Sequence, residues 1–558
     1  MGERELTLRA IALGLVLGVP LAAGNVYAGL KLGVVDAGGA TIVLIAFALF
    51  GAGRRRFSPG EAVVSQVSGS SAASMALTAG LVGPIPALAM SNRAVPLSAV
   101  VLWGCALAVF GSLLAIPFRK TFIEVKKLAF PSARATGEVI AKLFASTGDT
   151  GGRTAIWVLF GCAAAAAAFT VARDQLQLIP AAWFLPIAVA GVPAAALTLG
   201  FNFSPLVVGV GVLVGARVGI SILLGAVVAW AVVAPALVER GVAGASYPEL
   251  VSWTLWPGAA LMVAGSLATL LFDARDVLRA IRSAPAAREA TAAWVKPALV
   301  ASAAAVVAIG WLGFGVHPLH ALLAIAVAAA FSLAGMQATG ETDTTPSGPL
   351  GGLTQVVVGA LPPGGVGTPL HAGGVVNGAV THSSQMLAGW KTGEMFGSSP
   401  RRLLFAQLAG VATGAAAAAV AFWLIDRAYG IGTEAMPSPS ALSWKATADA
   451  VAGGTDSMPA GAPMAALAGV LAGVLLTLGE RSKALRRFLP SAVALGMGFI
   501  LPAMTAFTLA LSAIAFALVA RRAPGWTQRN APSLASGLIL GEASAGVVIA
   551  AIAVLSAG

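Results

Sequence analysis

The sequence predicts an all-α protein, a polytopic transmembrane bundle of about 16 helices with internal duplication and re-entrant segments, and two observations carry this prediction. Hydrophobic residues make up 58% of the 558 residues and charged residues only 10%, far below the roughly 25% charge of soluble domains. Apolar segments of about 20 residues, the length that crosses a bilayer, also recur from one end of the chain to the other. A chain this apolar has too few polar side chains to coat a water-facing surface, so we expect lipid to cover it.

Many apolar segments are candidates for these crossings. Some are too short or too rich in glycine to cross alone, which sets the expected number at about 16. Two weaker segments, residues 131–146 and 345–361, are expected to be re-entrant. The candidate spans are 8–32, 37–53, 61–83, 96–117, 154–173, 179–200, 205–216, 217–238, 252–272, 294–313, 318–336, 371–390, 402–424, 463–479, 487–503, 504–520 and 535–557.

The distribution of charge divides the chain into two transmembrane halves. The formal net charge is +12, and the basic residues gather in short loops between apolar spans, as in the cytoplasmic loops of membrane proteins. The largest basic loop, residues 273–293, is expected to link an N-terminal half (1–272) to a C-terminal half (294–558), and the more acidic segment 425–462 to form an external loop. The basic clusters lack interleaved aromatic residues, which argues against nucleic-acid binding. We expect a multi-pass protein of the cytoplasmic (inner) membrane that retains its first span.

The sequence lacks the motifs of several other classes of protein. Its two cysteines, Cys105 and Cys162, lie in apolar spans, and such isolated cysteines form neither a disulfide framework nor a metal site. The Gly-Lys pair of phosphate-binding loops is absent, as are the His-Glu-x-x-His and Gly-x-Ser-x-Gly patterns of two hydrolase classes. We therefore expect no ATPase, no bound metal and no cofactor.

Three pairs of short motifs occur in the same order in both halves. Ala-Gly-Leu-Lys at residues 28–31 returns as Ala-Gly-Trp-Lys at 388–391. Ser-Pro at 58–59 returns at 399–400, and Pro-Ser-Ala at 131–133 returns at 490–492. Internal duplication is a common plan of secondary transporters, which place their substrate between the two copies. Whether the copies are parallel or inverted stays open.

Polar residues inside apolar spans mark candidate functional positions, because an ionisable group at the bilayer centre costs about 2.5–3.5 kcal/mol. Asn25, Tyr27 and Lys31 close the first span, and the spacing of Tyr27 and Lys31 places both on one helix face. Snorkelling of Lys31 to the membrane interface is the alternative. Glu542 lies well inside the last span without a basic neighbour in sequence, so we expect it to face the protein interior. Glu138 follows Arg134 by four residues, a spacing that suits either an ion pair or proton handling.

The richest polar stretch spans residues 335–407, where glycine and proline interrupt the apolar pattern. Broken helices of this kind expose backbone groups to substrate in transporters, and a solvated loop is the alternative. The serine-rich run 65–74 leaves two alternatives open as well, close helix packing or a polar pathway. The candidate substrate-binding residues are Asn25, Tyr27, Lys31, Gln355, Asn377, Gln385 and Lys391, and the candidate coupling residues are Glu341, Asp343, Glu542 and Glu138.

Six motifs occur in an order that points to one family. They are Asn25–Gly33, Phe130-Pro131-Ser132 with Ala135 and Glu138, Glu341–Pro346 followed by Leu353-Thr354-Gln355, Gly389–Gly393 with Ser399-Pro400-Arg401 and Gln407, Gly496–Pro502, and Ser536–Glu542. Together they resemble the signatures of the oligopeptide transporter superfamily, on the side of its prokaryotic branch, which is related to the yellow-stripe-like metal-chelate transporters. Two departures stand out: the Asn-Pro-Gly signature of eukaryotic peptide transporters is absent, and Trp390 is an unusual neighbour for the lysine. The resemblance implies helices that arose by duplication and proton-coupled uptake of peptides or peptide-like metal chelates.

Three classes of function remain after these observations. The first is a proton-coupled symporter of short oligopeptides or, on the same fold, of metal-chelate or siderophore-like substrates. The second is a membrane-embedded enzyme that uses the acidic residues of 341–343, and the third is a passive channel. For the symporter we expect the lipid bilayer, the substrate and protons as partners. Whether the protein forms a homo-oligomer stays open.

Overall fold

The computed structural model describes residues 5–36, 38–50, 57–93, 95–145, 150–272, 293–362, 365–454, 458–482 and 484–556. Most of them lie in helices, which confirms the predicted all-α membrane fold. The chain forms two compact units, and each is described here by itself. Unit 1 comprises Met1–Val26, Val35–Ile156 and Asp273–Trp423, and unit 2 comprises Tyr27–Val34, Trp157–Phe272 and Leu424–Gly558.

Each unit takes one long segment from each predicted half of the chain. The division into halves at residues 273–293 and the internal duplication stay predictions. All of that basic linker except residue 293 lies outside the described residues.

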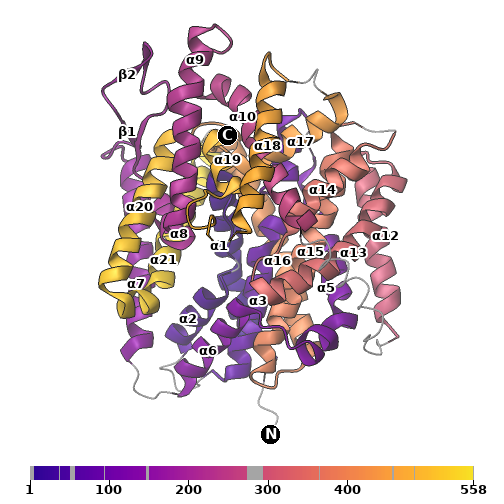
Figure 1. Ribbon diagram of the computed structural model, residues 1–558. Coiled ribbons are helices and arrows are strands. Elements are labelled where there is room, and N and C mark those ends of the chain that lie inside the picture. The colour runs from indigo at the N-terminus through magenta and orange to yellow at the C-terminus, as the bar shows by residue number, and fades with distance from the viewer. Residues whose placement is uncertain are drawn as a thin grey trace. The chain divides into compact units, whose positions relative to one another are not determined.

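Unit 1 is built around a long polar helix, α15 (Gly367–Glu394). The helices α3, α5, α13 and α14 pack against it, and Figure 1 shows α13 and α15 close together. Its other elements are α1 (Leu8–Leu32, as far as residue 26), α2 (Gly39–Phe50), α3 (Pro59–Thr78), α4 (Pro84–Met90), α5 (Leu97–Ala115), η1 (Ile116–Phe118), η2 (Lys120–Val125), α6 (Pro131–Ala145), the start of α7 (Thr150–Asp174), α12 (Val295–Phe314), α13 (Pro318–Thr342), α14 (Ser347–Gly359) and α16 (Pro400–Tyr429, as far as residue 423).

The serine-rich run of α3 serves close packing in unit 1. A Cβ on Gly410 would lie 2.1 Å from the backbone oxygen of Ser68, and a Cβ on Gly14 would lie 2.6 Å from that of Ser65. Only glycine permits α16 and α1 to approach α3 so closely. Several of the serine hydroxyls donate to backbone oxygens, as when Ser65 Oγ donates to Ala10 O at 2.8 Å. These contacts support the packing alternative for residues 65–74.

Unit 2 contains a second set of helices and the small strands. Within it α8 packs against α19, α20 and α21, and α10 packs against α17, α18 and α19. The elements are α7, β1 (Ala182–Phe184), β2 (Ala188–Val189), β3 (Val192–Pro193), β4 (Gly200–Asn202), α8 (Pro205–Ala226), η3 (Val227–Val233), α9 (Ala234–Glu239), α10 (Tyr247–Phe272), α17 (Pro439–Gly453), α18 (Ala462–Glu480), α19 (Ala492–Ile500), α20 (Ala503–Arg522) and α21 (Pro524–Ser556).

The predicted span at residues 179–200 is wrong. This segment forms two antiparallel strand pairs, β1 with β4 and β2 with β3. Pro186 and Pro193 lie inside the segment and Gly191 has a φ of +79°, so a continuous helix would lose backbone hydrogen bonds and clash at both prolines. The apolar composition alone could not reveal this, because it ignores proline.

Other predicted spans merge or shorten. The segments 205–216 and 217–238 form one helical stretch, Pro205–Glu239, with a break at Gly215, where φ is +77°. The segment 487–503 contains only the nine-residue helix α19, which ends before Pro502. Among the described residues, 11 helices are long and apolar enough to cross a membrane. Helices such as α3 and α15 fall short because serine, glycine and other polar residues lower their hydropathy, so the expectation of about 16 crossings stays a prediction.

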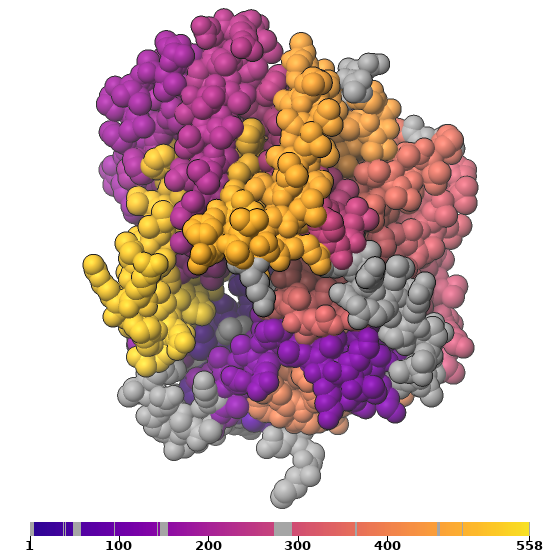
Figure 2. All heavy atoms as spheres, in the orientation of Figure 1, coloured from indigo at the N-terminus to yellow at the C-terminus, as the bar shows by residue number. Residues whose placement is uncertain are grey.

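The exposed face of α18 is apolar, as expected of a surface that lies against lipid. Its exposed residues are large and apolar, namely Met464, Leu467, Leu471 and Leu475. In Figure 2 this helix forms the orange column at the upper centre of the face in view. A water-facing helix would carry charged residues there, so this surface fits a hydrocarbon environment.

Candidate functional site

Glu542 is a fully buried carboxylate in the middle of α21, with 0% of its side chain exposed. Two glycines bring α21 close to α7: a Cβ on Gly541 would lie 2.2 Å from Ala163 O, and a Cβ on Gly537 would lie 2.6 Å from Leu159 O. This close approach allows Glu542 to reach the C-terminal end of α7. The carboxylate therefore faces the interior of unit 2, as its sequence context predicts.

Four donors surround the Glu542 carboxylate. Lys31 Nζ donates to Oε1 at 2.7 Å, and Arg173 Nη2 donates to the same oxygen at 3.3 Å. Ser204 Oγ donates to Oε2 at 2.7 Å and the backbone N–H of Leu206 donates to Oε2 at 2.9 Å. A buried carboxylate is costly unless it is paired and hydrogen-bonded, and this one meets both conditions.

The N-terminus of α8 contributes to this pairing. Ser204 is the N-cap of α8, and its hydroxyl accepts a hydrogen bond from the N–H of Val207 at 3.2 Å. The carboxylate of Glu542 accepts from Leu206, one of the helix's otherwise unpaired N–H groups. The positive end of the helix dipole thus adds to the two cations around one negative charge.

Arg173 balances its charge with a second carboxylate. Its Nε and Nη2 atoms donate to Asp174 at 2.6 and 2.7 Å, a bidentate pair, and its Nη1 donates to Phe203 O at 2.5 Å. Lys31 and Arg173 therefore face Glu542 and Asp174, two positive and two negative charges. Such a closed network holds its members in place until a competing charge enters.

Two tyrosines complete the surroundings of Lys31. Lys31 Nζ donates to Tyr27 Oη at 3.4 Å and lies 5.3 Å from the centre of the Tyr27 ring. The Tyr27 ring meets Tyr429 edge-on with centroids 6.2 Å apart, and Tyr429 Oη donates to Gly546 O at 3.1 Å. A Cβ on Gly546 would lie 2.4 Å from the Tyr27 ring, so the glycine makes room for that ring.

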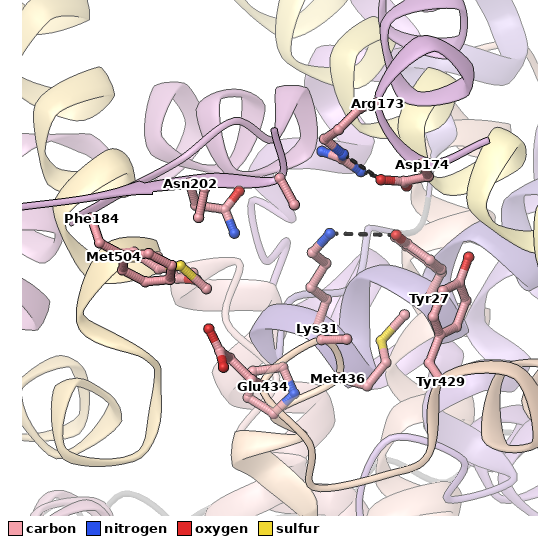
Figure 3. Close-up of a pocket in the computed structure, with 15 residues that line it drawn as sticks. Tyr27, Lys31, Arg173, Asp174, Phe184, Asn202, Tyr429, Glu434, Met436 and Met504 are labelled. Carbon is pink, nitrogen blue, oxygen red and sulfur yellow. Dashed lines mark hydrogen bonds and ion pairs between the residues drawn. The ribbon is translucent and has the colours of Figure 1, made fainter. Parts of the chain in front are cut away.

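A cavity of about 410 Å³ lies beside this network, wholly within unit 2 (Figure 3). Its volume falls within the roughly 300–1,000 Å³ range of small-molecule sites. The wall combines charged, polar and apolar side chains, and the lining residues are Tyr27, Lys31, Arg173, Asp174, Ala181, Ala182, Phe184, Asn202, Tyr429, Glu434, Ala435, Met436, Pro437, Met504 and Thr505. In Figure 3 the side chain of Lys31 extends into the space between Glu434 and Arg173.

The strands that replace the predicted span form one side of this cavity. β1 supplies Phe184 and β4 supplies Asn202. The backbone N–H of Asn202 donates to Thr508 Oγ1 at 2.9 Å, and the Thr508 hydroxyl donates to Asn202 O at 3.0 Å, which fixes β4 to α20. The side-chain oxygen of Asn202 has no hydrogen-bond partner among the described residues.

The loop between α16 and α17 forms another side. Gly430 and Gly432 have φ values of +69° and +81°, and Gly432 N donates to Met436 O at 2.8 Å. Further along, Ser438 N donates to Leu30 O at 2.8 Å, next to Lys31. The loop thus has a defined shape and is fixed to the end of α1. It lies within the predicted external loop, residues 425–462, whose side of the membrane stays a prediction.

Glu434 projects from this loop toward the cavity (Figure 3). Within the part of the chain that the structure describes, its carboxylate has no hydrogen bond and no ion pair. Partial burial raises the pKa of Glu434 above the ordinary value of a glutamate. An unpaired carboxylate here is available to a cationic group in the cavity.

The other predicted site residues belong to unit 1, where backbone groups or local partners occupy several of them. Asn25 Nδ2 donates to Asp36 O and Ala73 O at 2.7 and 3.0 Å, and Asn377 Nδ2 donates to Leu77 O at 3.0 Å. Gln355 is buried in α14, and Gln385 is half-buried in α15. Lys391 Nζ pairs with Glu394 at 2.7 Å, and that glutamate is 43% exposed.

The predicted coupling carboxylates of unit 1 lie at exposed positions. Glu341 accepts from Gln337 Nε2 at 2.7 Å, and Glu138 pairs with Arg134 at 3.2 Å. Asp343 has a φ of +66° at the C-terminal end of α13 and accepts from the hydroxyl and, at 2.9 Å, from the backbone N–H of Ser132. Of the eleven predicted residues, the cavity of unit 2 therefore gathers Tyr27 and Lys31 in its wall, with Glu542 directly behind Lys31.

Sequence reasoning missed several residues of this cavity, above all Arg173, Asp174 and Glu434. One signal could have revealed the first two. An adjacent Arg-Asp pair ends an apolar span, whereas a single basic residue is enough to hold a helix end at the membrane interface. Glu434 lies in a Gly- and Pro-rich segment that resembles an ordinary loop in sequence, so no sequence signal distinguishes it.

The charged and polar side chains of the cavity wall suit an organic ion. Among the described residues, no group of three or more His, Cys, Asp or Glu side chains is arranged to hold a metal ion. A cavity with lysine, arginine and carboxylates in its wall can instead bind the charged ends of an organic molecule.

Comparisons with known proteins find a matching family and several relatives. The family described as "OPT oligopeptide transporter protein" matches residues 5–553. A protein of Oryza sativa subsp. japonica described as "Probable metal-nicotianamine transporter YSL8" is 24% identical over 76% of this chain and 69% of its own length. A protein of Saccharomyces cerevisiae described as "Putative oligopeptide transporter YGL114W" is 24% identical over 97% of this chain and 95% of its own length.

Proposed function

This chain belongs to the OPT oligopeptide transporter family, and from that premise we propose that it is a secondary active transporter that couples the uptake of short oligopeptides to protons. Membership makes it a multi-pass membrane transporter and not an enzyme. The substrate and the coupling ion are the proposed part. We place the protein in the cytoplasmic membrane and leave a homo-oligomeric assembly open.

The observation that carries the proposal is Lys31, which lies in the cavity wall and is paired with the buried Glu542 behind it. The C-terminal carboxylate of a peptide that enters the cavity competes with Glu542 for this ammonium group. Lys31 forms a charge-assisted hydrogen bond with either carboxylate, so for this ammonium group the exchange is close to balanced. Substrate binding thus changes the surroundings of Glu542.

Proton coupling follows from the change in that balance. With Lys31 turned toward the substrate, Glu542 keeps Arg173, which it shares with Asp174, and the donors of Ser204 and Leu206. A buried carboxylate that loses a cation binds a proton more readily. Substrate and proton therefore enter together, and release of both restores the Lys31–Glu542 pair.

The other predicted carboxylates, Glu341, Asp343 and Glu138, stay candidates for a later proton step. Their exposed positions and local partners make them weaker candidates for sensing substrate than Glu542. Lys391, Gln385, Asn377, Gln355 and Asn25 likewise stay candidates for a substrate path through unit 1.

Uptake of a labelled tripeptide into proteoliposomes tests this function. We expect accumulation when the outside is more acidic than the inside, and loss of accumulation when a protonophore collapses the gradient. Equal uptake with and without the gradient would contradict proton coupling. Conductance without accumulation would favour a channel instead.

A metal chelate is the second candidate substrate. The name of the rice relative supports it, and so does the lack of a metal-ligand cluster among the described residues, because a metal would then have to enter already bound by its chelator. The same proteoliposomes distinguish the two substrates. Accumulation of the chelate without accumulation of the tripeptide would favour chelate transport.

A further inference from the structure

We propose that the cavity recognises zwitterions, with Glu434 binding the ammonium end of the substrate while Lys31 binds the carboxylate end. This inference rests on the proposed peptide transport and goes beyond it, because it assigns a specificity-determining residue and a substrate class: peptides with both ends free.

The first support is the arrangement of charge in the cavity wall. Lys31 and Arg173 are engaged with Glu542 and Asp174, so that network is neutral before substrate arrives. Glu434 adds one carboxylate without a counter-ion among the described residues. A substrate with one carboxylate and one ammonium group pairs with both Lys31 and Glu434, and the proton that Glu542 is proposed to take up removes the one negative charge that remains.

The second support is the rigidity of the loop that carries Glu434. Met436 N donates to Thr433 Oγ1 at 3.1 Å, and Ser438 N donates to Leu30 O at 2.8 Å. Because Leu30 precedes Lys31, the same hydrogen bond holds the two charged groups in a fixed relation. Fixed spacing between opposite charges selects ligands by length, as a flexible surface carboxylate could not.

The third support is the apolar wall beside these groups. Phe184, Met436 and Met504 line the cavity, and Figure 3 shows Met436 and Met504 with their thioether groups on either side of it. Methionine side chains adapt their shape to varied partners. Charged ends held by fixed groups, with an adaptable middle, suit peptides that differ in their side chains.

Other charged or titratable groups also face this cavity, and they set the electrostatic surroundings of Glu434. They are Tyr27, Lys31, Arg173, Asp174 and Tyr429, and Tyr247 lies within electrostatic reach of Glu434. Asp174 cannot take the ammonium role as readily, because Arg173 already occupies both of its oxygens.

The test compares binding of trialanine, N-acetyl-trialanine and trialanine amide to the purified full-length protein by calorimetry. For the wild type we expect N-acetylation to weaken binding about tenfold or more, since one charged contact is lost. In Glu434→Gln, trialanine should bind as weakly as the acetylated peptide, whereas amidation should still weaken binding. Glu239→Gln, an exposed glutamate at the end of α9 and away from the cavity lining, is the matched control and should behave like the wild type.

Each outcome of this test has a distinct meaning. If trialanine binds but acetylation costs the same in the wild type and in Glu434→Gln, Glu434 does not bind the ammonium group and the inference fails alone. If none of the three peptides binds the wild type, peptide transport and the inference fail together. If Glu434→Gln does not fold, Glu434→Asp provides a second variant that keeps the negative charge. This variant must still bind trialanine more tightly than N-acetyl-trialanine, or the inference is wrong.

Discussion

Lys31 and Lys391 occupy matching positions in the predicted internal repeat, but their surroundings differ sharply. Lys31 in unit 2 pairs with Glu542, which is fully buried, whereas Lys391 in unit 1 pairs with Glu394, which is 43% exposed. The buried polar residues of unit 1 are instead largely neutral: His382 lies between Ser71 and Thr78, with ring nitrogens 3.3 and 2.9 Å from their hydroxyls. The buried charge of Glu542 adjoins a cavity, whereas these neutral groups bind helices to one another.

The difference separates buried polar groups that bind helices together from those that lie beside a cavity. In unit 1, Gln407 Nε2 donates to Ser112 Oγ at 2.8 Å, and Asn377 donates to a backbone oxygen, so these amides bind helices together. In unit 2, the partners of Glu542 come from α1, α7 and the start of α8, and two of them reach the cavity. A ligand in this cavity can therefore alter the network around Glu542.

The largest expected effect comes from Glu542→Gln. Removal of one charge from a buried ion pair costs about 3–5 kcal/mol, because Lys31 and Arg173 lose their shared counter-ion. We expect uptake to be abolished and the melting temperature to fall. Glu480→Gln, which breaks a half-exposed pair with Arg217, is the control and should cost at most about 1 kcal/mol. Normal uptake by Glu542→Gln would remove this carboxylate from the mechanism.

The matched pair Lys31→Met and Lys391→Met tests the comparison directly. Lys31→Met removes a charge-assisted hydrogen bond to substrate, worth about 1.5–3 kcal/mol, so binding of trialanine should weaken about tenfold to more than a hundredfold. Lys391→Met breaks an exposed pair and should change binding less than about fivefold. Calorimetry on both variants provides the measurement. Equal losses would mean that the two lysines share one role, and the contrast between the units would be lost.

His382→Leu should affect stability alone. The substitution leaves the buried Thr78 hydroxyl without its partner, at a cost of about 1–3 kcal/mol. We expect a lower melting temperature with unchanged peptide affinity. A change in affinity without a change in melting temperature would show that the unit 1 network takes part in binding.

The smallest expected effect is a pH dependence at Glu434. Its pKa is raised by burial, so the folded protein binds a proton at this carboxyl more readily than the unfolded chain does. Ionisation of this carboxyl therefore disfavours folding slightly. The effect begins as the pH rises above the ordinary glutamate pKa and grows until the pH reaches the raised pKa. Without ligand, Glu434→Gln should melt slightly higher than the wild type at pH 7.5, and the difference should vanish at pH 4. Thermal shift scans at both pH values measure this difference. A lower melting temperature of Glu434→Gln than of the wild type at pH 7.5 would contradict the prediction.

The sequence was sufficient for the fold class and for part of the site. Composition and spacing identified apolar helices, and the position of Glu542 in an apolar span correctly indicated that it faces inward. The pairing of Lys31 with Glu542 joins residues 511 positions apart, and no local pattern encodes such a contact. The sequence pattern does not distinguish Arg173, because one basic residue at a helix end is common.

Composition does not predict the strands or the loop of unit 2. Residues 179–200 are as apolar as a membrane span, and only the prolines distinguish them. Glu434 depends on a loop shape that is set by positive φ values and by one hydrogen bond to Leu30, and neither is visible in a single sequence.

The hydrogen bond from Leu206 N–H to Glu542 has a consequence for experiments. Amide hydrogens exchange with solvent when their bonds open, so the Leu206 amide is a built-in isotopic reporter on the carboxylate. When Glu542 takes up a proton it accepts less strongly, and deuterium should enter at Leu206 faster than at Val207, whose amide is held by Ser204. Exchange at this single position would therefore follow the protonation of Glu542 without any label on the substrate.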